Sequence, residues 1–281
     1  MTADPDLAAA IQRNVDTALA EDVGSGDLTA QLIPEAKTAT ARIISREAAV
    51  LCGSPWFEAC FRRLDPTVDI RWLVPEGAAV APDQTLCEIR GNARALLTAE
   101  RPALNFLQTL SATATATRRY VEAIAGTGAA IMDTRKTLPG LRLAQMYAVL
   151  VGGWRNQRAG LYDGILIKEN HIMAAGGVRQ AMEQAMSLAP AGVPIQIEVE
   201  SLAELRESLD AGAKLVLLDN FTLADMCEAV AITAGRAELE ASGGITLDSL
   251  RAIAETGVDR ISVGSLTKDV KAVDLSMRFD Q

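Results

Sequence analysis

Charged side chains follow directly after several short apolar runs in the second half of the chain. The clearest case is DTRKTLPGLR, where Arg135 and Lys136 come just after the apolar run AAIM. Two like charges about 4 Å apart repel by roughly 4 kcal/mol at an effective dielectric constant of 20, so neighbouring cations in a cleft call for an anion. Arg158 in NQRAG and Lys168 in LIKEN extend the set, and Arg101 in AERPALN is a candidate from the first half. Arginine binds carboxylate or phosphate through two hydrogen bonds and lysine acts as a compact charge, so the set predicts a site for an anionic ligand.

Acidic residues leave a second interpretation of these cations open. The chain has 36 Asp and Glu against 27 Lys and Arg, so each cation could instead be neutralised in a structural ion pair with a neighbouring acid. Glu198 and Asp219 themselves end two apolar runs. They could hold a divalent cation such as Mg²⁺, which commonly binds one or two carboxylates plus substrate oxygens. Equally, they could be counter-ions for nearby lysines.

Two glycine-bearing turns, SGGIT and VGSLT, follow the last two apolar runs. Glycine lets a backbone approach an anion closely, and the N–H groups at the start of a following helix can bind phosphate. The alternative is that both are ordinary tight turns. The candidate phosphate-binding residues are Ser242, Gly243, Gly244, Val263, Gly264 and Ser265.

Six apolar runs alternate with helical patterns from about residue 129 onward. Such alternation is typical of parallel strands joined by right-handed helical crossovers. So many units in series indicate an α/β fold that is an incomplete (β/α) barrel, with an open doubly wound sheet as the alternative. Barrel enzymes place their chemistry at the strand ends, which is where the polar residues cluster. The expected strands lie within residues 129–135, 164–170, 195–200, 214–221, 237–245 and 259–266, and the expected helices within 141–153, 177–189, 201–212, 222–235 and 246–257.

The first part of the chain has a different pattern. Residues 41–53 and 67–91 alternate as strands with turns, and residues 93–125 predict two successive helices. We therefore expect an N-terminal α+β sandwich domain over residues 1–112 and a barrel domain over 113–269. The tail, 270–281, is expected to pack on one of the two. The turn EDVGSGDLT is interpreted as a structural or lid turn.

Composition excludes several classes of function. The formal net charge of −9, with no basic tail, argues against nucleic-acid binding. No apolar run approaches the roughly 18 residues needed to span a bilayer. The four cysteines lack metal-site spacing and the first residues lack a secretory pattern, which predicts a reduced, cytoplasmic protein. The only histidine, His171, belongs to no triad or metal cluster and is expected to orient its neighbours rather than act as a base.

Several motifs together resemble one family over nearly the whole chain. They are EDVGSGDLT, AERPALNFLQTLS, DTRKTLPGLR, GLYDGILIKENHI, IEVESL, LLDNF, ASGGIT and TGVDRISVGSLTKDVKAVDLSMRF, and they resemble the bacterial quinolinate phosphoribosyltransferases. The resemblance implies a type II phosphoribosyltransferase fold and a homodimer that shares residues between its active sites. It also implies that phosphoribosyl pyrophosphate and quinolinate, with Mg²⁺, give nicotinate mononucleotide, pyrophosphate and carbon dioxide for NAD synthesis.

The resemblance also implies roles for individual residues. Arg135, Arg158 and Lys168 would hold the pyridine dicarboxylate, with Arg101 reaching in from the partner subunit. Lys136 would face the pyrophosphate, and Glu198 and Asp219 the ribose and the metal, so that Lys136, Lys168, Glu198 and Asp219 would carry the catalysis. The other substrate-binding positions implied are Thr134, Gln157, Ser242, Gly243, Gly244, Val263, Gly264 and Ser265.

Three positions near the acceptor pocket depart from the family pattern. They are Met146 in QMYAV, Trp154 in GGWRNQR and Gln157, where the family has a histidine. Gln157 keeps an N–H donor but cannot become a cation, which predicts weaker binding of an anionic acceptor. The departures leave open a related transferase with another acceptor, such as the molybdenum-transport-associated homologues. Other classes that remain are a non-catalytic anion-binding barrel and a Schiff-base lyase with Lys168 as the amine.

Overall fold

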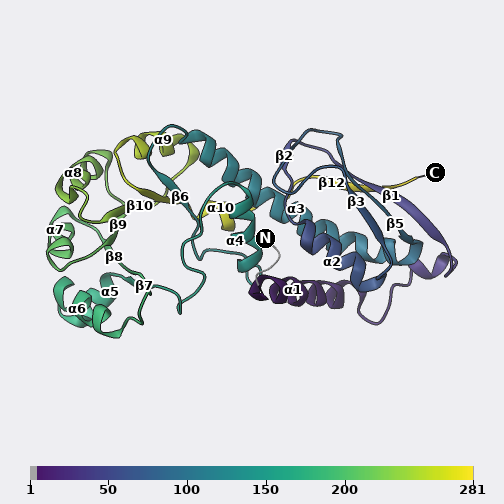
Figure 1. Cartoon of the computed structure of the whole chain (residues 1–281), viewed down its shortest axis with the longest axis horizontal. Helices are drawn as coiled ribbons and strands as arrows, with labels where there is room; N and C mark the ends of the chain where they lie inside the picture. Colours follow the sequence, from purple (N-terminus) through teal and green to yellow (C-terminus); the bar gives the residue numbers. More distant parts are fainter. Residues whose placement is uncertain (1–4, 281) are drawn as a thin grey trace. The chain divides into compact units, whose positions relative to one another are not determined.

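An antiparallel sheet and a long helix form the first of two compact units in the computed structural model, which describes residues 5–280 (Figure 1). The first unit contains the residues up to Arg118, Thr137–Gly153 and those from Leu266 onward. The second contains Arg119–Lys136 and Trp154–Ser265. Residues 137–153 fall within the expected barrel domain, yet they group with the first unit. None of the described helices combines the length and the apolar composition needed to cross a bilayer.

The sheet of the first unit has the strand order β12-β1-β5-β3. The C-terminal strand β12 pairs antiparallel with β1. Aromatic and aliphatic side chains from helices and strands form a core around Trp56, Phe57, Ile43 and Leu107, each fully buried. The elements are α1 (Pro5–Val23), a 3₁₀ turn (Ala30–Leu32), β1 (Thr38–Ser45), β2 (Ala49–Val50), α2 (Ser54–Leu64), β3 (Asp69–Trp72), β4 (Ala79–Val80), β5 (Thr85–Asn92), α3 (Ala93–Ala123), α4 (Arg142–Val151), α10 (Ser265–Lys268) and β12 (Leu275–Phe279).

Helix α3 corrects one expectation. Two successive helices were expected over residues 93–125, but a single 31-residue helix runs from Ala93 to Ala123 with Pro102 inside it. A proline removes only one intrahelical hydrogen bond. Buried side chains lie on both sides of it, including Ala99 and Ala103, so packing along the whole helix outweighs that loss. Helices α1 and α2 were not expected from the sequence either.

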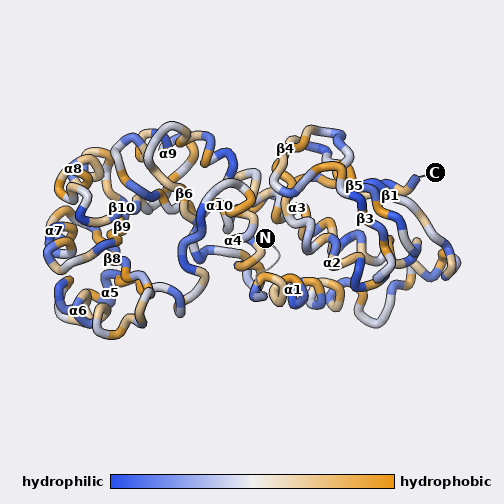
Figure 2. The backbone as a smooth tube through the Cα atoms, in the orientation of Figure 1, coloured by the Kyte–Doolittle hydropathy of each residue, from blue (hydrophilic) through white to orange (hydrophobic). Residues whose placement is uncertain are grey.

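The second unit contains a six-stranded parallel sheet with the order β6-β11-β10-β9-β8-β7. Apart from β6, this order follows the chain, as in a barrel and unlike an open doubly wound sheet. Helices α6 to α9 line the outer side of the curved sheet in Figure 1, and their mixed hydropathy is visible in Figure 2. The elements are β6 (Ala130–Met132), β7 (Ile165–Ile167), α5 (Glu169–Ala175), α6 (Val178–Leu188), β8 (Ile195–Val199), α7 (Leu202–Asp210), β9 (Leu215–Asp219), α8 (Leu223–Thr233), β10 (Glu238–Ser242), α9 (Leu247–Glu255) and β11 (Arg260–Ser262).

The barrel is incomplete between β6 and β7, which are the two edges of the sheet. The segment after Gly153 runs along the β6 edge, where an isolated parallel bridge joins Met132 and Arg155. The helix expected after the first strand is present as α4, but it groups with the first unit and contacts α1. The loop that carries Gln157 and Arg158 therefore lies beside an unpaired sheet edge.

The two faces of the parallel sheet differ in chemistry. Successive side chains of a strand point to opposite faces, and the register places Glu198, Leu217 and Glu240 side by side on one face. Polar residues recur on that face, whereas the other face is apolar and fully buried. The apolar face contains Ile131, Ile197, Val199, Val216, Leu218, Ala241 and Ile261.

Candidate active site

Two arginines lie close together after β6. Arg135 lies in the segment that follows the strand, after Asp133 and Thr134, and Arg158 comes from the loop beside the sheet edge; both arginines are partly buried. The pKa of Arg158 is lowered, mainly by burial and then by the charge of Arg135. Its Nη1 atom donates to the carbonyl of Gly164 at 3.2 Å, and Asp163 nearby partly offsets the lowering. The structure thus brings together two cations that repel each other.

Lys168 and Glu198 form an ion pair at the ends of β7 and β8. The Nζ atom of Lys168 lies 2.8 Å from Oε2 of Glu198. The Lys168 side chain is 49% exposed and that of Glu198 only 15%, so the lysine is the more accessible partner. The structural ion pair considered from the sequence is therefore present for Lys168. The lysine remains at the strand ends, where an incoming anion could compete with Glu198.

Carboxylates gather beside this ion pair. The pKa of Glu200 is raised, first by Glu169 and then in part by Asp219 and Glu198, so these acids lie close enough to interact. Among the described residues, no cluster of three or more His, Cys, Asp or Glu side chains could hold a metal ion by itself. An ion at this edge would therefore need oxygens from a ligand.

Asn220 holds Asp219 at the end of β9. Its Nδ2 atom donates to Oδ2 of Asp219 at 2.9 Å, and its backbone N–H donates to the carbonyl of Ser242 at 3.0 Å. Asn220 has a left-handed φ of 55°, a conformation that asparagine tolerates better than most residues. A Cβ atom on Gly243 would lie 2.1 Å from Oδ1 of Asn220, so the SGG turn needs glycine there to let this side chain approach.

Lys136 packs against the glycine turn that follows β11. A Cβ atom on Gly264 would lie 3.2 Å from Cδ of Lys136 and 3.5 Å from Oγ1 of Thr134. Thr134 in turn accepts a hydrogen bond from the Lys136 backbone N–H at 3.2 Å. The expected pyrophosphate-side lysine and the expected phosphate turn are therefore neighbours. Figure 2 shows the segment after β6 as a hydrophilic stretch.

The two remaining residues of the VGS turn behave differently. Val263 is buried, and its backbone N–H donates to the carbonyl of Met132 at 3.0 Å. That N–H is consequently engaged with β6. The hydroxyl oxygen of Ser265 is buried and has no hydrogen-bond partner among residues 5–280. Buried polar groups are normally hydrogen-bonded, so Ser265 is suited to accept a ligand as its partner.

A polar network lies inside the sheet, below these strand ends. Glu240 on β10 is 1% exposed and accepts hydrogen bonds from Nε2 of Gln196 at 2.9 Å, from Nε2 of Gln157 at 3.0 Å and from the Ser262 hydroxyl. Nε2 of Gln157 also donates to Oε1 of Gln196 at 3.0 Å. Both amide hydrogens of Gln157 are thus used inside the protein, so the donor expected to face the acceptor points into this network instead.

Asp133 is a second buried carboxyl beside the network. It is 1% exposed, and Oδ1 accepts the backbone N–H of Gln157 at 2.7 Å. Burial raises the pKa of Asp133 to about 6; the hydrogen bond from Gln157 opposes this shift and the charge of Glu240 adds to it. Burial also raises the pKa of Glu240, against the hydrogen bonds that it accepts.

His171 confirms its expected orienting role. Its Nδ1 atom accepts the backbone N–H of Lys168 at 3.0 Å, and together these residues cap the start of α5. Asp27 of the EDVGSGDLT turn likewise has structural partners. It accepts from the backbone of Ala30 and from the hydroxyl of Thr98, and these bonds lower its pKa.

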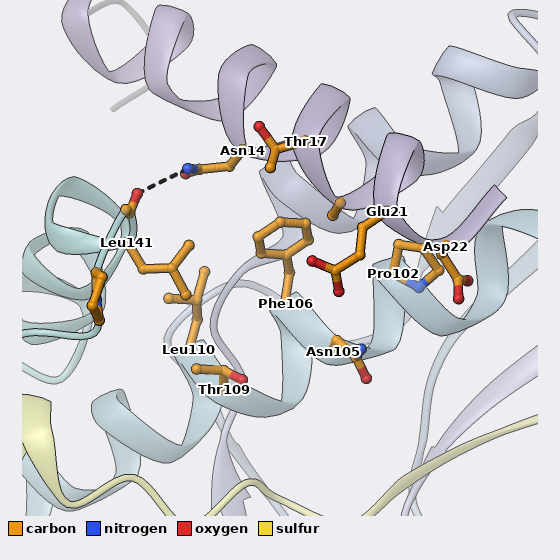
Figure 3. A pocket seen from close by; sticks show the side chains of 13 residues that line it. Asn14, Thr17, Glu21, Asp22, Pro102, Asn105, Phe106, Thr109, Leu110 and Leu141 are labelled. Carbon is orange, nitrogen blue, oxygen red and sulfur yellow. Dashed lines mark hydrogen bonds between the residues drawn. The ribbon is translucent and has the colours of Figure 1, made fainter. Parts of the chain in front are cut away.

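Arg101 and Met146 belong to the first unit. Arg101 is exposed on α3, whereas Met146 is buried in α4. The same unit contains a pocket of about 340 Å³ between α1, α3 and the segment 139–141 (Figure 3). In that view, Glu21 and Asp22 stand at the α1 side, Phe106 projects from α3, and Asn14 donates to the carbonyl of Gly140 at 3.0 Å. All residues that line this pocket lie in the first unit.

Sequence reasoning missed the residues inside the sheet. Gln196, Glu240 and Ser262 were not candidates because they lie within the expected strands, whereas most of the predicted site residues lie at the ends of strands or after them. The signal was present in the strands themselves. IQIEV and ELEAS each contain polar residues at alternate positions, which is unusual for strands covered on both faces.

The second unit is an incomplete (β/α) barrel. Cations, carboxylates and glycine turns gather at one end of its sheet, and such an arrangement suits the binding of anionic ligands. The comparisons give the family. The sequence model of the quinolinate phosphoribosyl transferase C-terminal domain matches residues 113–278, and that of the N-terminal domain matches residues 27–111. The chain belongs to the quinolinate phosphoribosyl transferase family.

Individual relatives agree with this assignment. The probable nicotinate-nucleotide pyrophosphorylase (carboxylating) of Bacillus subtilis is 41% identical over 257 residues, which cover 92% of this chain and 89% of that protein. A mitochondrial quinolinate phosphoribosyltransferase (decarboxylating) 2a of Nicotiana tabacum is 37% identical and covers 94% of this chain and 80% of its own. The solved nicotinate-nucleotide pyrophosphorylase of Francisella tularensis superposes with a TM-score of 0.94 at 45% identity, covering 97% and 96% of the two chains.

Proposed function

We infer that this chain transfers the phosphoribosyl group of phosphoribosyl pyrophosphate to quinolinate, giving nicotinate mononucleotide, pyrophosphate and carbon dioxide. The single observation that carries the inference is the proximity of Arg135 and Arg158, two partly buried cations; burial first, and then the charge of Arg135, lower the pKa of Arg158. An acceptor with two carboxylates would relieve their repulsion. The family membership and the relatives' names agree with this reaction.

The site residues divide the two substrates between them in this proposal. Arg135, Arg158 and Lys168 bind the carboxylates of quinolinate, and Lys168 exchanges Glu198 for the ligand. Lys136 faces the leaving pyrophosphate. The SGG turn and Gly264 accept the 5′-phosphate, with the unpartnered Ser265 hydroxyl as a further donor. The closeness of Lys136 to Gly264 supports these roles, because a Cβ atom on Gly264 would lie 3.2 Å from Cδ of Lys136.

The chemistry asks for positioning and charge stabilisation rather than for a protein nucleophile. The ring nitrogen of quinolinate forms a bond to C1′ of the ribose while the bond from C1′ to pyrophosphate breaks, through a transition state with a cationic sugar. Asp219 and Glu198 would stabilise the developing positive charge, and Lys136 the departing negative one. The glycosylated ring nitrogen is positive, so it accepts the electron pair left when the adjacent carboxylate departs as carbon dioxide. A proton then completes the product.

Glu198 and Asp219 are the residues that we propose to hold Mg²⁺. The donor set fits that ion, because Mg²⁺ in phosphate chemistry uses one or two carboxylates and completes its shell with substrate oxygens and water. When bound, the ion would neutralise charge on the leaving pyrophosphate. Chelation with EDTA should abolish turnover and added Mg²⁺ should restore it. Full activity in EDTA would contradict this part of the proposal.

The reaction is tested directly with purified protein. Incubation with phosphoribosyl pyrophosphate, Mg²⁺ and quinolinate should release pyrophosphate and carbon dioxide in equal amounts with nicotinate mononucleotide. Nicotinate, which has one carboxylate, is the matched control and should react far more slowly because one arginine loses its partner. No product with quinolinate, but product with another pyridine acid, would show that the acceptor is different.

We further propose that the active protein is a homodimer to which Arg101 contributes across the interface. Arg101 is exposed and forms no ion pair with any described residue. Arg94, Thr98 and Arg101 lie on the same side of α3 because they are spaced as i, i+4 and i+7. Arg94 and Thr98 form hydrogen bonds to the loop that carries Leu28 and Leu32. These leucines are 81% and 84% exposed. Two large apolar side chains so exposed on one short loop suit a surface that a partner covers.

Subunit mixing tests the shared site. Arg101→Ala and Arg158→Ala homodimers should each be nearly inactive. Mixing them after partial unfolding should restore about a quarter of wild-type activity, because half of the dimers form by cross-pairing and each has one intact site. Refolding each variant alone is the control. No recovery on mixing, with dimers present, would place Arg101 in the site of its own chain or outside any site.

The cytoplasmic location stays a prediction.

A further inference from the structure

Glu240 is a buried carboxylate for which the proposed reaction has no direct use. It is 1% exposed on β10 and forms no ion pair with any residue in the described part of the chain. Arg260, on the neighbouring strand β11, forms its ion pair with Glu238, which lies on β10 like Glu240. An unpaired buried charge is costly unless hydrogen bonds compensate it. A carboxylate retained there needs a structural reason or a functional one.

Neutral donors surround both oxygens of Glu240. Oε1 accepts from Ser262 and from Gln157, and Oε2 accepts from Gln196 at 2.9 Å and from Gln157 at 3.3 Å. The amide N–H groups among these donors cannot accept a hydrogen bond from a carboxylic acid, and only the Ser262 hydroxyl could. The contacts therefore favour the ionised form, although burial raises the pKa of Glu240.

The network fixes the orientation of the Gln157 amide. Its Nε2 atom faces acceptors on both Glu240 and Gln196. Exchanging the amide oxygen and nitrogen would set Oε1 of Gln157 against those same acceptors, which is repulsive. The carboxylate therefore decides which way this side chain points and leaves it no N–H for a ligand.

Residue 157 is held at two points. The backbone N–H is bound by Asp133 at 2.7 Å and the side chain by Glu240. The loop around it runs beside the open edge of the sheet, where the described structure has the single bridge between Met132 and Arg155. Arg158 is the next residue. Holding Gln157 in place therefore also fixes the position of the Arg158 backbone, from which the guanidinium side chain extends.

We propose that Glu240 is a positioning residue for the acceptor: it locks the Gln157 amide beneath the strand ends and so sets Arg158 beside Arg135. The carboxylate does not touch the substrate. It acts through Gln157, and its removal should loosen the arginine without disturbing the phosphate turns. This inference rests on the proposed function, because the acceptor it concerns is quinolinate.

Steady-state kinetics of Glu240→Gln, with each substrate varied in turn, is the test. The amide replaces one acceptor oxygen by a donor, so one N–H of Gln157 loses its partner. We expect kcat/KM for quinolinate to fall about tenfold or more, the usual effect of losing a hydrogen bond to a charged group. The KM for phosphoribosyl pyrophosphate should stay within about twofold. Equal losses for both substrates would overturn the proposal.

A double-mutant cycle separates positioning through Gln157 from a general structural role. In a Gln157→Ala background, adding Glu240→Gln should change kcat/KM for quinolinate by less than about twofold, since the link is already cut. If the double variant instead lost kcat/KM for quinolinate by the product of the two single-variant factors, the proposal would be overturned. Glu238→Gln is the matched control: it changes the same strand two residues away, at a side chain that is 52% exposed, and should leave the kinetics unchanged.

A milder variant keeps the test available if Glu240→Gln does not fold. Ser262→Ala removes one donor to Glu240 and leaves its charge, and we expect kcat/KM for quinolinate to fall about threefold with the other substrate unaffected. Folded Ser262→Ala protein with wild-type constants would overturn the proposal. Wild-type protein is assayed first. If it gives no product with quinolinate, the proposed function has failed; if only the variants behave unexpectedly, the positioning role has failed.

Discussion

The two units of this chain differ in what they bury. The buried polar residues of the first unit, such as Ser111, Thr113 and Gln145, are neutral, and Trp56 and Leu107 lie in a core of aromatic and aliphatic side chains. Asp133 and Glu240 are the fully buried carboxyls of the described chain, and both belong to the second unit.

This difference separates stability from chemistry. Burying a charge is unfavourable, so a fold retains one where another requirement outweighs that cost. In the second unit the apolar face of the sheet provides packing, while the opposite face carries the carboxyls next to the cations that we assign to the substrates. Changes in the buried core of the first unit should therefore act on stability alone. Changes inside the second should depend on pH or on substrate.

Leu107→Ala should have the largest effect, and it should act on stability. Leu107 is fully buried in α3, and such truncations typically lower the free energy of unfolding by about 3 to 5 kcal/mol. Because no buried carboxyl is involved, the loss should be the same at pH 5 and pH 7.5. Urea unfolding followed by circular dichroism at both values is the measurement. A loss that varies strongly with pH would break the proposed contrast between the units.

Arg158→Ala should lower kcat/KM for quinolinate by about 100-fold to 1000-fold, because a paired carboxylate loses a partly desolvated guanidinium. The KM for phosphoribosyl pyrophosphate should change little. Arg158→Lys keeps the charge and should recover part of the loss. Arg71→Ala is the control in the first unit, where Arg71 forms an exposed pair with Glu88; its kinetics should match the wild type. Similar losses for both substrates of Arg158→Ala would contradict the assignment.

Asp133→Asn should change how the free energy of unfolding depends on pH, because it removes a buried carboxyl that titrates. The folded pKa of Asp133 is about 6, against an ordinary value of 3.8. The folded state therefore holds the proton more tightly, and wild-type stability falls as pH rises from about 4 to about 6. Asparagine can still accept the Gln157 N–H but does not titrate. Relative to wild type, the variant should gain up to about 3 kcal/mol between pH 4 and pH 7.5, measured by urea unfolding.

Asp27→Asn in the first unit is the matched control for that titration. The pKa of Asp27 is lowered by its hydrogen bonds, so its contribution to stability is complete above its ordinary value of 3.8. The variant should be less stable than wild type by a constant amount from pH 5 to pH 7.5. A flat difference for Asp133→Asn as well would show that Asp133 titrates normally.

The strands and their polar ends could be predicted from the sequence because both signals are local. Short apolar runs separated by amphipathic stretches place six strands, and the residues after each run, such as Arg135 and Lys168, lie at one end of a parallel sheet by topology alone. All six expected strands are present, and each is shorter than expected.

The interior network could not be predicted in the same way. Gln157 contacts Gln196 and Glu240, which lie 39 and 83 residues further along the chain. The direction of its amide depends on that distant carboxylate rather than on neighbouring residues. The continuous α3 and the grouping of α4 with the first unit were missed for a similar reason. Both depend on packing against residues that are distant in the sequence.

Asn220 gives the smallest expected effect and the sharpest local test. The residue has a left-handed backbone and holds Asp219 through its amide at 2.9 Å. Asn220→Gly keeps that backbone conformation readily and removes only the amide. We expect kcat to fall about tenfold, about 1.4 kcal/mol, as one hydrogen bond to the Asp219 carboxylate is lost. Steady-state kinetics at saturating substrates and Mg²⁺ is the measurement.

Asn220→Asp separates the hydrogen bond from the backbone. Aspartate also tolerates the left-handed conformation, but it sets a second carboxylate where the amide of Asn220 now lies against Asp219. Like charges so close raise the pKa of one partner, so activity should be lower than in Asn220→Gly near pH 8 and should recover as pH falls and a shared proton replaces the amide hydrogen. If the glycine and aspartate variants both match wild type across that range, Asp219 is not held by Asn220. The polar ends of the sheet would then be less organised than its interior, because Glu240 would retain a network that Asp219 lacks.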